Sequence, residues 1–133
     1  MSFQMSNLQN LILKTEQELE QWWLSTEDKC FYCKITLEEF ISLRNFVLNY
    51  NGDNSEIKKF KRVFASEKQA KIRWMTIDRL NNSKGYEIDN ITKSCWFCNH
   101  IKGVYLSSED MMLIANRIIN RLKDEVLKET NAT

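Results

Sequence analysis

Four cysteines arranged in two pairs constrain this chain more than any other feature of its sequence. Cys30 and Cys33 form one C-x2-C pair. Cys95 and Cys98 form a second, and the 133-residue chain has no other cysteine. Two intervening residues allow the backbone to present both thiolates to one tetrahedral Zn²⁺, at about 2.3 Å per Zn–S bond. Two such pairs complete a closed site, which predicts a structural zinc that supplies folding free energy.

The long separation of the pairs leaves other interpretations open. The 61 residues between them exceed the gap in a compact zinc ribbon, although they have room for a helical insertion while the pairs meet in space. The alternatives are buried thiols, a redox-active C-x2-C pair or an iron–sulfur cluster. No thioredoxin-like pattern surrounds either pair, and both pairs have the same spacing. We therefore predict zinc bound by all four thiolates.

Composition and charge narrow the class of protein. With 43% hydrophobic and 28% charged residues, the chain has ordinary globular composition. Its net charge of +1 provides no global field for nucleic acid, so phosphate contacts must come from local clusters. Neither a signal peptide nor an apolar run near the about 20 residues of a membrane span is visible. We expect an intracellular protein, in the cytoplasm or in the nucleoid or nucleus of a host cell, with no membrane partner.

Hydrophobic periodicity predicts several helices within one domain, residues 1–133. Apolar residues at helical spacing predict an N-terminal helix over 6–24. A second helix begins at Thr36, which forms a capping-box pattern with Glu39, and a shorter basic helix is expected within 55–69. A C-terminal helix is expected over 107–127. Its predicted buried stripe consists of Met112, Ala115, Ile118, Ile119, Leu122 and Val126.

Before the second cysteine pair, the hydrophobic pattern changes from helical spacing to alternation at every second residue. Alternation over 72–79, with frequent β-branched and aromatic residues, predicts a strand. A turn cluster at 81–85 and a short return strand at 88–92 complete a hairpin. About one helical turn over 99–102 follows, ended by Gly103. The predicted fold class is α+β: a small, mostly helical domain with a hairpin–helix unit braced by the four-cysteine zinc site.

The motifs around the second pair resemble the HNH family of ββα-metal endonucleases. They are Thr76-Ile77-Asp78-Arg79-Leu80, Gly85-Tyr86, Asp89-Asn90-Ile91 and Cys95-Trp96-Phe97-Cys98-Asn99-His100-Ile101-Lys102-Gly103. The similarity is closest to a zinc-braced four-cysteine branch seen in phage, viral and mobile-element proteins, where Asp-Arg ends the first strand. The segment 29–33 fits the upstream zinc knuckle of such proteins. The resemblance covers about 29–103, with a helical insertion over 34–70.

The resemblance implies a site that hydrolyses DNA phosphodiester bonds with one Mg²⁺ or Mn²⁺. Asp78 and Asn99 correspond to the metal ligands, Asn90 to the asparagine that ties the loop together, and Lys102 to a lysine that can face a phosphate. Mg²⁺ prefers oxygen ligands and needs only one or two from the protein when water and substrate complete the octahedron. Such a metal polarises the phosphoryl group.

One residue departs from the family pattern. The family's general base is a histidine directly after the metal-binding aspartate, where this chain has Arg79. A guanidinium stays protonated in proteins, so Arg79 cannot activate water, although it can bind the phosphate and stabilise transition-state charge. The candidates for the proton acceptor are His100, which is the only histidine, Tyr86 in the hairpin, and a metal-bound hydroxide.

Other functions fit the same sequence. A catalytically inactive HNH-like zinc module could bind nucleic acid or a protein partner, and Arg79 favours this alternative. A small structural subunit could dock through its terminal helices, and a homodimer is one such arrangement. Taken singly, each candidate residue also has a plainer interpretation: Asp78 and Arg79 as a solvated ion pair, and the basic run 58–62 as a solvated helix face.

Overall fold

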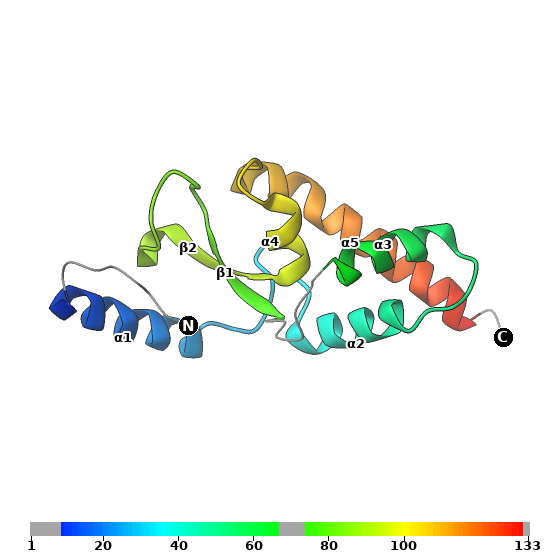
Figure 1. The fold of residues 1–133 in the computed structure, drawn as a ribbon, viewed down its shortest axis with the longest axis horizontal. Coiled ribbons are helices and arrows are strands. Elements are labelled where there is room, and N and C mark those ends of the chain that lie inside the picture. The colour runs from blue at the N-terminus through cyan, green and yellow to red at the C-terminus, as the bar shows by residue number, and fades with distance from the viewer. Residues whose placement is uncertain (1–8, 67–73, 132–133) are drawn as a thin grey trace.

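The structure is a computed structural model that describes residues 9–66 and 74–131 (Figure 1). These residues contain five α-helices, one short 3₁₀ turn and a single β-hairpin. The elements are α1 (Gln9–Ser25), α2 (Leu37–Leu48), α3 (Ser55–Ala65), β1 (Met75–Arg79), η1 (Ile88–Asn90), β2 (Ile91–Cys95), α4 (Trp96–Lys102) and α5 (Ser108–Asn131). This is a small, mostly helical α+β fold with a hairpin–helix unit, which confirms the predicted fold class. No helix in the described ranges is long and apolar enough to cross a membrane.

The hairpin pairs β1 with β2 in antiparallel register, from Met75 opposite Cys95 to Arg79 opposite Ile91. The return strand was expected at 88–92, but 88–90 form a 3₁₀ turn and pairing begins at Ile91. The reason is the side chain of Asn90. Its Oδ1 accepts from the Asn81 amide at 2.9 Å and its Nδ2 donates to the Gly85 carbonyl at 2.9 Å, so the loop closes before the strand begins.

The helix after the hairpin is longer than the single turn expected over 99–102. It begins at Trp96, directly after the strand, because the side chain of Cys95 accepts a hydrogen bond from the Cys98 amide and caps the first turn. Gly103 ends it with φ of 53°, as a residue tolerant of positive φ can. The cysteine pair therefore lies at the strand–helix junction rather than ahead of the helix.

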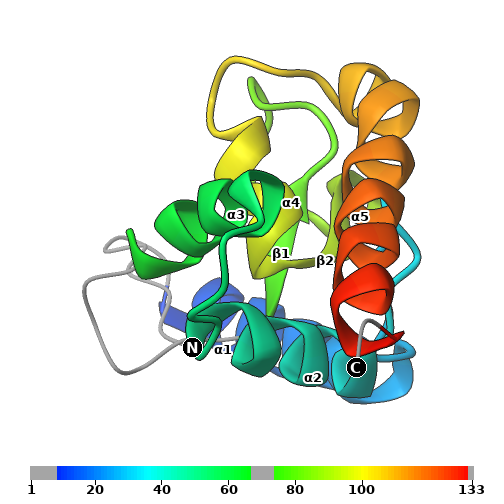
Figure 2. The same cartoon turned by 90° about the vertical axis from the view of Figure 1, so that its right-hand side faces the viewer.

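Helices α2, α3 and α5 form the main core together with α4 (Figure 2). The capping box of α2 is present, with the Glu39 amide donating to Thr36 Oγ1 at 3.2 Å and the Thr36 amide donating to Glu39 Oε1 at 3.0 Å. The expected stripe of α5 was wrong at its first position, because Met111 is buried whereas Met112 is 46% exposed. The buried positions are those that face α2, α3 and α4: Met111, Ala115, Ile119 and Leu122.

Helix α1 lies at the opposite end of the molecule from α2 and the C-terminal end of α5, below the hairpin in Figure 1. Lys93 of β2 attaches it. The buried Lys93 Nζ donates to the carbonyls of Trp23 and Thr26 and to the Asp28 carboxylate, each at 2.9 Å. The last carbonyls of a helix have no intrahelical hydrogen-bond donor. The Lys93 ammonium supplies donors to carbonyls at the C-terminal end of α1.

Candidate metal centre and adjoining polar site

The four cysteines meet at one buried point. Cys30 and Cys33 lie in the loop before α2, while Cys95 ends β2 and Cys98 lies in the first turn of α4. All four Sγ atoms lie within 4.8 Å of one another, and the sulfurs of Cys33 and Cys95 are 3.9 Å apart. A tetrahedral ion with Zn–S bonds of about 2.3 Å requires sulfurs about 3.8 Å apart, so the cluster fits a structural zinc.

Both pairs adopt the same local geometry. The Cys33 amide donates to Cys30 Sγ at 3.5 Å, and the Cys98 amide donates to Cys95 Sγ at 3.4 Å. In each pair the second residue's amide therefore points at the first sulfur, which favours its thiolate form. The cysteines form no disulfides with one another, which leaves all four sulfurs free as ligands.

The first knuckle is held against the second by the backbone. Lys34 adopts a positive φ of 66°, and the Cys30 amide donates to the Ile35 carbonyl at 2.8 Å, which closes the knuckle. The Phe31 amide then donates to the Lys93 carbonyl of β2 at 2.9 Å. This bond brings the two distant pairs together. The helices between them in the sequence are therefore an insertion that leaves the shared site and returns to it.

The electrostatics of the cluster favour a bound cation. Burial raises the pKa of Cys95, whereas a hydrogen bond with Cys33 holds the pKa of Cys30 below its ordinary value. Four buried thiolates could not all be ionised without a compensating positive charge. A divalent ion that prefers sulfur ligands would supply that charge, and binding it would release thiol protons.

Asp78 lies beside this cluster in a buried polar network. Its side chain is 5% exposed, its Oδ2 accepts a hydrogen bond from the Tyr32 hydroxyl, and its Oδ1 lies 3.3 Å from Lys102 Nζ. Burial, followed by this bond to Asp78, raises the pKa of Tyr32. Lys102 also donates to the Arg79 carbonyl at 2.9 Å and to Asn82 Oδ1 at 2.5 Å. The carboxylate is thus charge-compensated within the protein.

Helix α4 contacts one face of β1 through two matched pairs. Thr76 and Asp78 are two residues apart in the strand and share a face. Asn99 and Lys102 are three apart in the helix and share a side of it. Asn99 Nδ2 donates to Thr76 Oγ1 at 2.9 Å. Two residues further along β1, Asp78 contacts Lys102 from the next turn of α4. The structure therefore brings Asp78, Asn99 and Lys102 to a single strand–helix contact.

The other sequence-predicted residues lie around this contact. Asn90 ties the hairpin loop, as described above. The guanidinium of Arg79 lies 5.2 Å from the ring centroid of Tyr86, and its Nη1 donates to the Lys84 carbonyl at 3.3 Å. The exposed ring of His100 stacks on Trp96, with centroids 4.7 Å apart and planes at 13°. Since residues adjacent in a helix point about 100° apart, His100 lies on a different face of α4 from Asn99.

Sequence reasoning missed three partners in the network: Tyr32, Thr76 and Asn82. Tyr32 stood only as part of the first knuckle, and its partner Asp78 is 46 positions away. No spacing rule could have joined them. The one available signal was the phenol between two cysteines, because a tyrosine buried by a metal knuckle needs a partner for its hydroxyl.

Comparison with known proteins adds no relative, since no family model, curated protein or solved structure matches the chain. The HNH resemblance therefore rests on the motif residues. Within the described part of the chain, the four cysteines are the group of three or more His, Cys, Asp or Glu side chains placed to hold a metal. A second metal ion at Asp78 would depend on one carboxylate, the Asn99 amide oxygen and water.

Proposed function

We propose that this chain is a zinc-braced HNH-like endonuclease that hydrolyses DNA phosphodiester bonds with one Mg²⁺ or Mn²⁺. The observation that carries the proposal is the matched contact of α4 with β1, where Asp78 and Asn99 approach from two elements. Asn99 reaches β1 through Thr76 at 2.9 Å, two residues from Asp78. A hairpin followed at once by a helix carries Asp78 on the strand and Asn99 on the helix, and a carboxylate and an amide oxygen are ligands that suit a hard divalent cation.

The zinc would fix the relation between those elements. Cys95 lies at the end of β2 and Cys98 in the first turn of α4, so one ion bound by both restrains the strand–helix junction. Cys30 and Cys33 add the loop that also carries Tyr32 to Asp78. A structural ion here would therefore position the carboxylate without touching the substrate.

Asp78 and Asn99 would hold the divalent metal, which would supply Lewis-acid polarisation of the phosphoryl group. Tyr32 and Lys102 orient the Asp78 carboxylate from two sides. Asn99 is fixed through Thr76, which directs its amide group toward β1. These contacts restrict the ligand side chains before a metal binds, which reduces the entropic cost of binding.

Arg79 would bind the scissile phosphate or one beside it. Its guanidinium lies over Tyr86, so the side chain is already extended along the hairpin loop. A planar guanidinium can donate two parallel hydrogen bonds to phosphate oxygens. Tyr86 contacts Arg79, whereas His100 stacks on Trp96. His100, Tyr86 and a metal-bound hydroxide are the candidates for the proton acceptor, and Tyr86 could accept a proton only as its phenolate.

The test is nicking of supercoiled plasmid in Mg²⁺ or Mn²⁺ by the zinc-loaded protein. Asp78→Asn keeps the shape of the side chain and should reduce nicking by at least 100-fold. Asp89→Asn removes an exposed carboxylate from the same hairpin and should leave nicking within twofold of the wild type. Equal activity of Asp78→Asn and wild type would reject the assignment of Asp78.

A second candidate function is a non-catalytic HNH-like module that binds nucleic acid. One observation favours it: both carboxylate oxygens of Asp78 already have protein partners, Tyr32 and Lys102. Arg79 also stands where the family has its base. This candidate predicts DNA binding that weakens steeply with salt, and no cleavage with any divalent metal. The plasmid assay separates the two functions directly.

A further inference from the structure

We propose that the exposed side of α3 is a second DNA contact, which binds the phosphate backbone at a distance from the HNH-like site. We call this surface the basic face of α3 and define it by Lys58, Lys59 and Arg62. The inference rests on the proposed function only in taking DNA as the partner, and it applies to the catalytic and the non-catalytic candidate alike.

The helix separates its side chains sharply into two faces. Ile57, Phe60 and Phe64 are buried at helical spacing. The opposite stripe is exposed and carries the three cations among small side chains: Ser55, Lys58, Lys59, Arg62, Ala65 and Ser66. No acidic residue lies on this stripe. The small neighbours leave room for a sugar–phosphate backbone to approach the cations closely.

Nearby acidic groups do not cancel the charge of the basic face. Glu56 is the one acidic residue of α3, and its two carboxylate oxygens lie 2.7 Å from Lys59 Nζ and 3.0 Å from Arg121 Nη2. One carboxylate shared by two cations leaves a net positive charge. Lys58 lies 3.9 Å from Asp53, but both side chains are exposed and such a pair is weak. A chain with net charge +1 therefore concentrates positive charge here.

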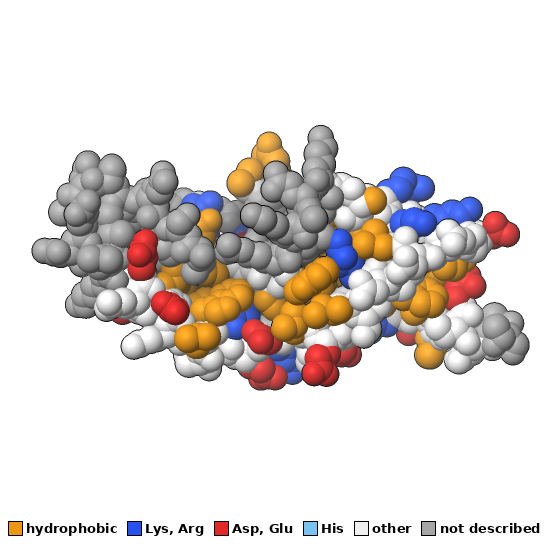
Figure 3. Space-filling model, turned by 60° about the horizontal axis from the view of Figure 1, so that its bottom comes forward, with side chains coloured by type: hydrophobic (Ala, Val, Ile, Leu, Met, Phe, Trp, Pro, Cys, Tyr) orange, Lys and Arg blue, Asp and Glu red, His pale blue; other side chains and the backbone are white. Residues whose placement is uncertain are grey.

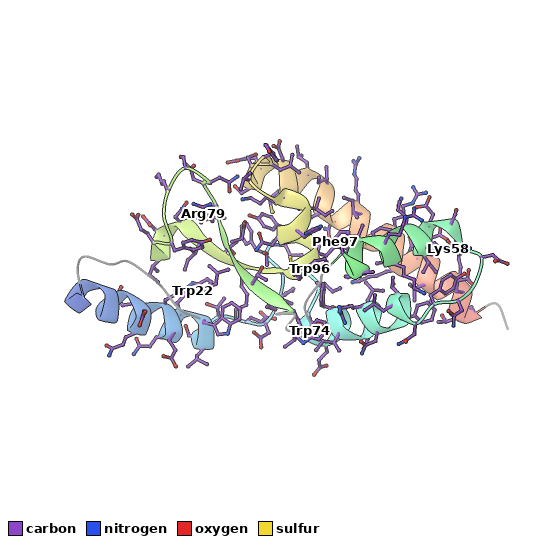
Figure 4. All side chains as sticks on the ribbon, viewed as in Figure 1. Trp22, Lys58, Trp74, Arg79, Trp96 and Phe97 are labelled. Atoms are coloured by element: carbon purple, nitrogen blue, oxygen red, sulfur yellow. The ribbon has the colours of Figure 1, made fainter. Side chains whose placement is uncertain are left out.

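The figures agree with this distribution. In Figure 3, Lys and Arg side chains gather at the right of the molecule, the end where Figure 1 places α2, α3 and α5. Acidic side chains lie along the lower edge of the same view, and others lie at its right end and toward its left. Lys58 extends outward from α3 in Figure 4. The upper right of this view is therefore mainly positive, with acidic side chains beside it.

Aromatic packing connects the basic face to the proposed site. Phe60 and Phe64 pack on Phe97 of α4, with ring centroids 5.6 and 5.5 Å apart, and Phe64 stacks on Trp96 at 6.0 Å. Another side of α4 carries Asn99 against β1. The basic face therefore lies on the side of α3 that points away from α4 and from the proposed site.

The experiment measures binding of a fluorescent 24-base-pair duplex by anisotropy, with zinc-loaded protein and without added Mg²⁺, from 50 to 200 mM salt. The test variant is Lys58→Ala/Lys59→Ala/Arg62→Ala. The control is Lys29→Ala/Arg117→Ala/Lys128→Ala, which removes the same charge from exposed positions elsewhere. Alanine suits helices, so α3 should be retained, and circular dichroism verifies this.

The test variant should bind at least tenfold more weakly at 100 mM salt. Its plot of log K against log salt should be less steep by about 2 to 3, because each phosphate contact contributes about 0.9. The control should stay within threefold of wild type. Equal loss in both triple variants, or no loss in the test variant, would overturn the proposal, as would a wild type that binds no duplex at 50 mM salt.

Failure of this inference is distinguishable from failure of the nuclease proposal. Plasmid nicking on the same proteins reports the HNH-like site separately. Duplex binding that depends on the basic face, without nicking in any metal, rejects the nuclease and leaves the second contact standing. If the wild type nicks plasmid but the basic-face variant binds duplex as tightly as wild type, the second contact is rejected and the nuclease proposal stands.

Discussion

The ammonium of Lys102 lies 3.3 Å from a carboxylate oxygen of Asp78, and both side chains are almost completely buried. Lys102 also donates to the Arg79 carbonyl and to Asn82 Oδ1. The end of α4 is thereby joined to β1 and to the hairpin loop. A buried pair of this kind adds little net stability over an apolar pair, but removal of one partner leaves an uncompensated buried charge.

Replacing Lys102 by methionine should therefore destabilise the protein strongly. The expected loss in free energy of unfolding is about 3 kcal/mol or more, because Asp78 remains buried without its cation. Adding Asp78→Asn to the same protein should recover part of the loss. Urea unfolding with saturating zinc measures both. Lys84→Met, in the exposed hairpin loop, should change stability by no more than about 0.5 kcal/mol. An unaltered stability for Lys102→Met would mean that Asp78 carries no charge beside it.

Tyr32 makes the stability depend on pH in the alkaline range. Burial and the bond to Asp78 raise the pKa of Tyr32 above its unfolded value of about 10. A raised folded pKa gives stabilisation that is complete below pH 10. It is lost as the pH rises further, because only the unfolded state then releases the proton.

The prediction compares urea midpoints of wild type and Tyr32→Phe between pH 8.5 and 11. The wild type should lose stability above pH 10 more steeply than the variant. Tyr105→Phe is the matched control, because Tyr105 is 93% exposed, and it should follow the wild type. Parallel curves for wild type and Tyr32→Phe would show that the Tyr32 hydroxyl is not held in its protonated form by folding.

The elements that follow from local chemistry were predictable from the sequence. The two cysteine pairs specified the cluster, and Thr36 with Glu39 specified the start of α2. The start of β2 was not predictable, because Asn90 satisfies loop backbone groups that a strand would otherwise use. Met111 and Met112 are the same residue type, and only the position of the neighbouring helices decides which one is buried.

The polar contacts of the site were beyond sequence reasoning for another reason. Lys93 reaches partners 65 to 70 positions earlier, and Tyr32 reaches Asp78 across 46 positions. Such pairs depend on how the helices pack against the hairpin, and the hydrophobic periodicity of the sequence does not indicate them. Lys102 was expected to face a phosphate and lies 1% exposed in the structure, so its contact with substrate stays a prediction.

The cysteine cluster should bind one zinc per chain. Elemental analysis should find this stoichiometry, and Co²⁺ substitution should give the absorption of a tetrahedral thiolate site. Cys98→Ser should lower the zinc content and the helical circular dichroism together, because metal binding supplies folding free energy. Ser42→Ala, on the exposed side of α2, should retain both. Native protein that contains no zinc, and keeps its helical signal with a chelator, would contradict the assignment.

Lys93 should control the attachment of α1 to the hairpin. Its ammonium donates to two carbonyls at the end of α1 and lies 4.1 Å from the ring centroid of Trp23. Lys93→Met keeps the apolar part of the side chain but leaves those carbonyls without their donor, at a cost of about 2 kcal/mol. Amide hydrogen exchange in residues 16–25 should therefore accelerate about 30-fold, while α2 stays within threefold of wild type. Lys29→Met, at an exposed neighbouring position, should leave both helices unchanged. If α1 exchanges no faster in Lys93→Met than in Lys29→Met, the apolar contacts of α1 alone hold it against the hairpin.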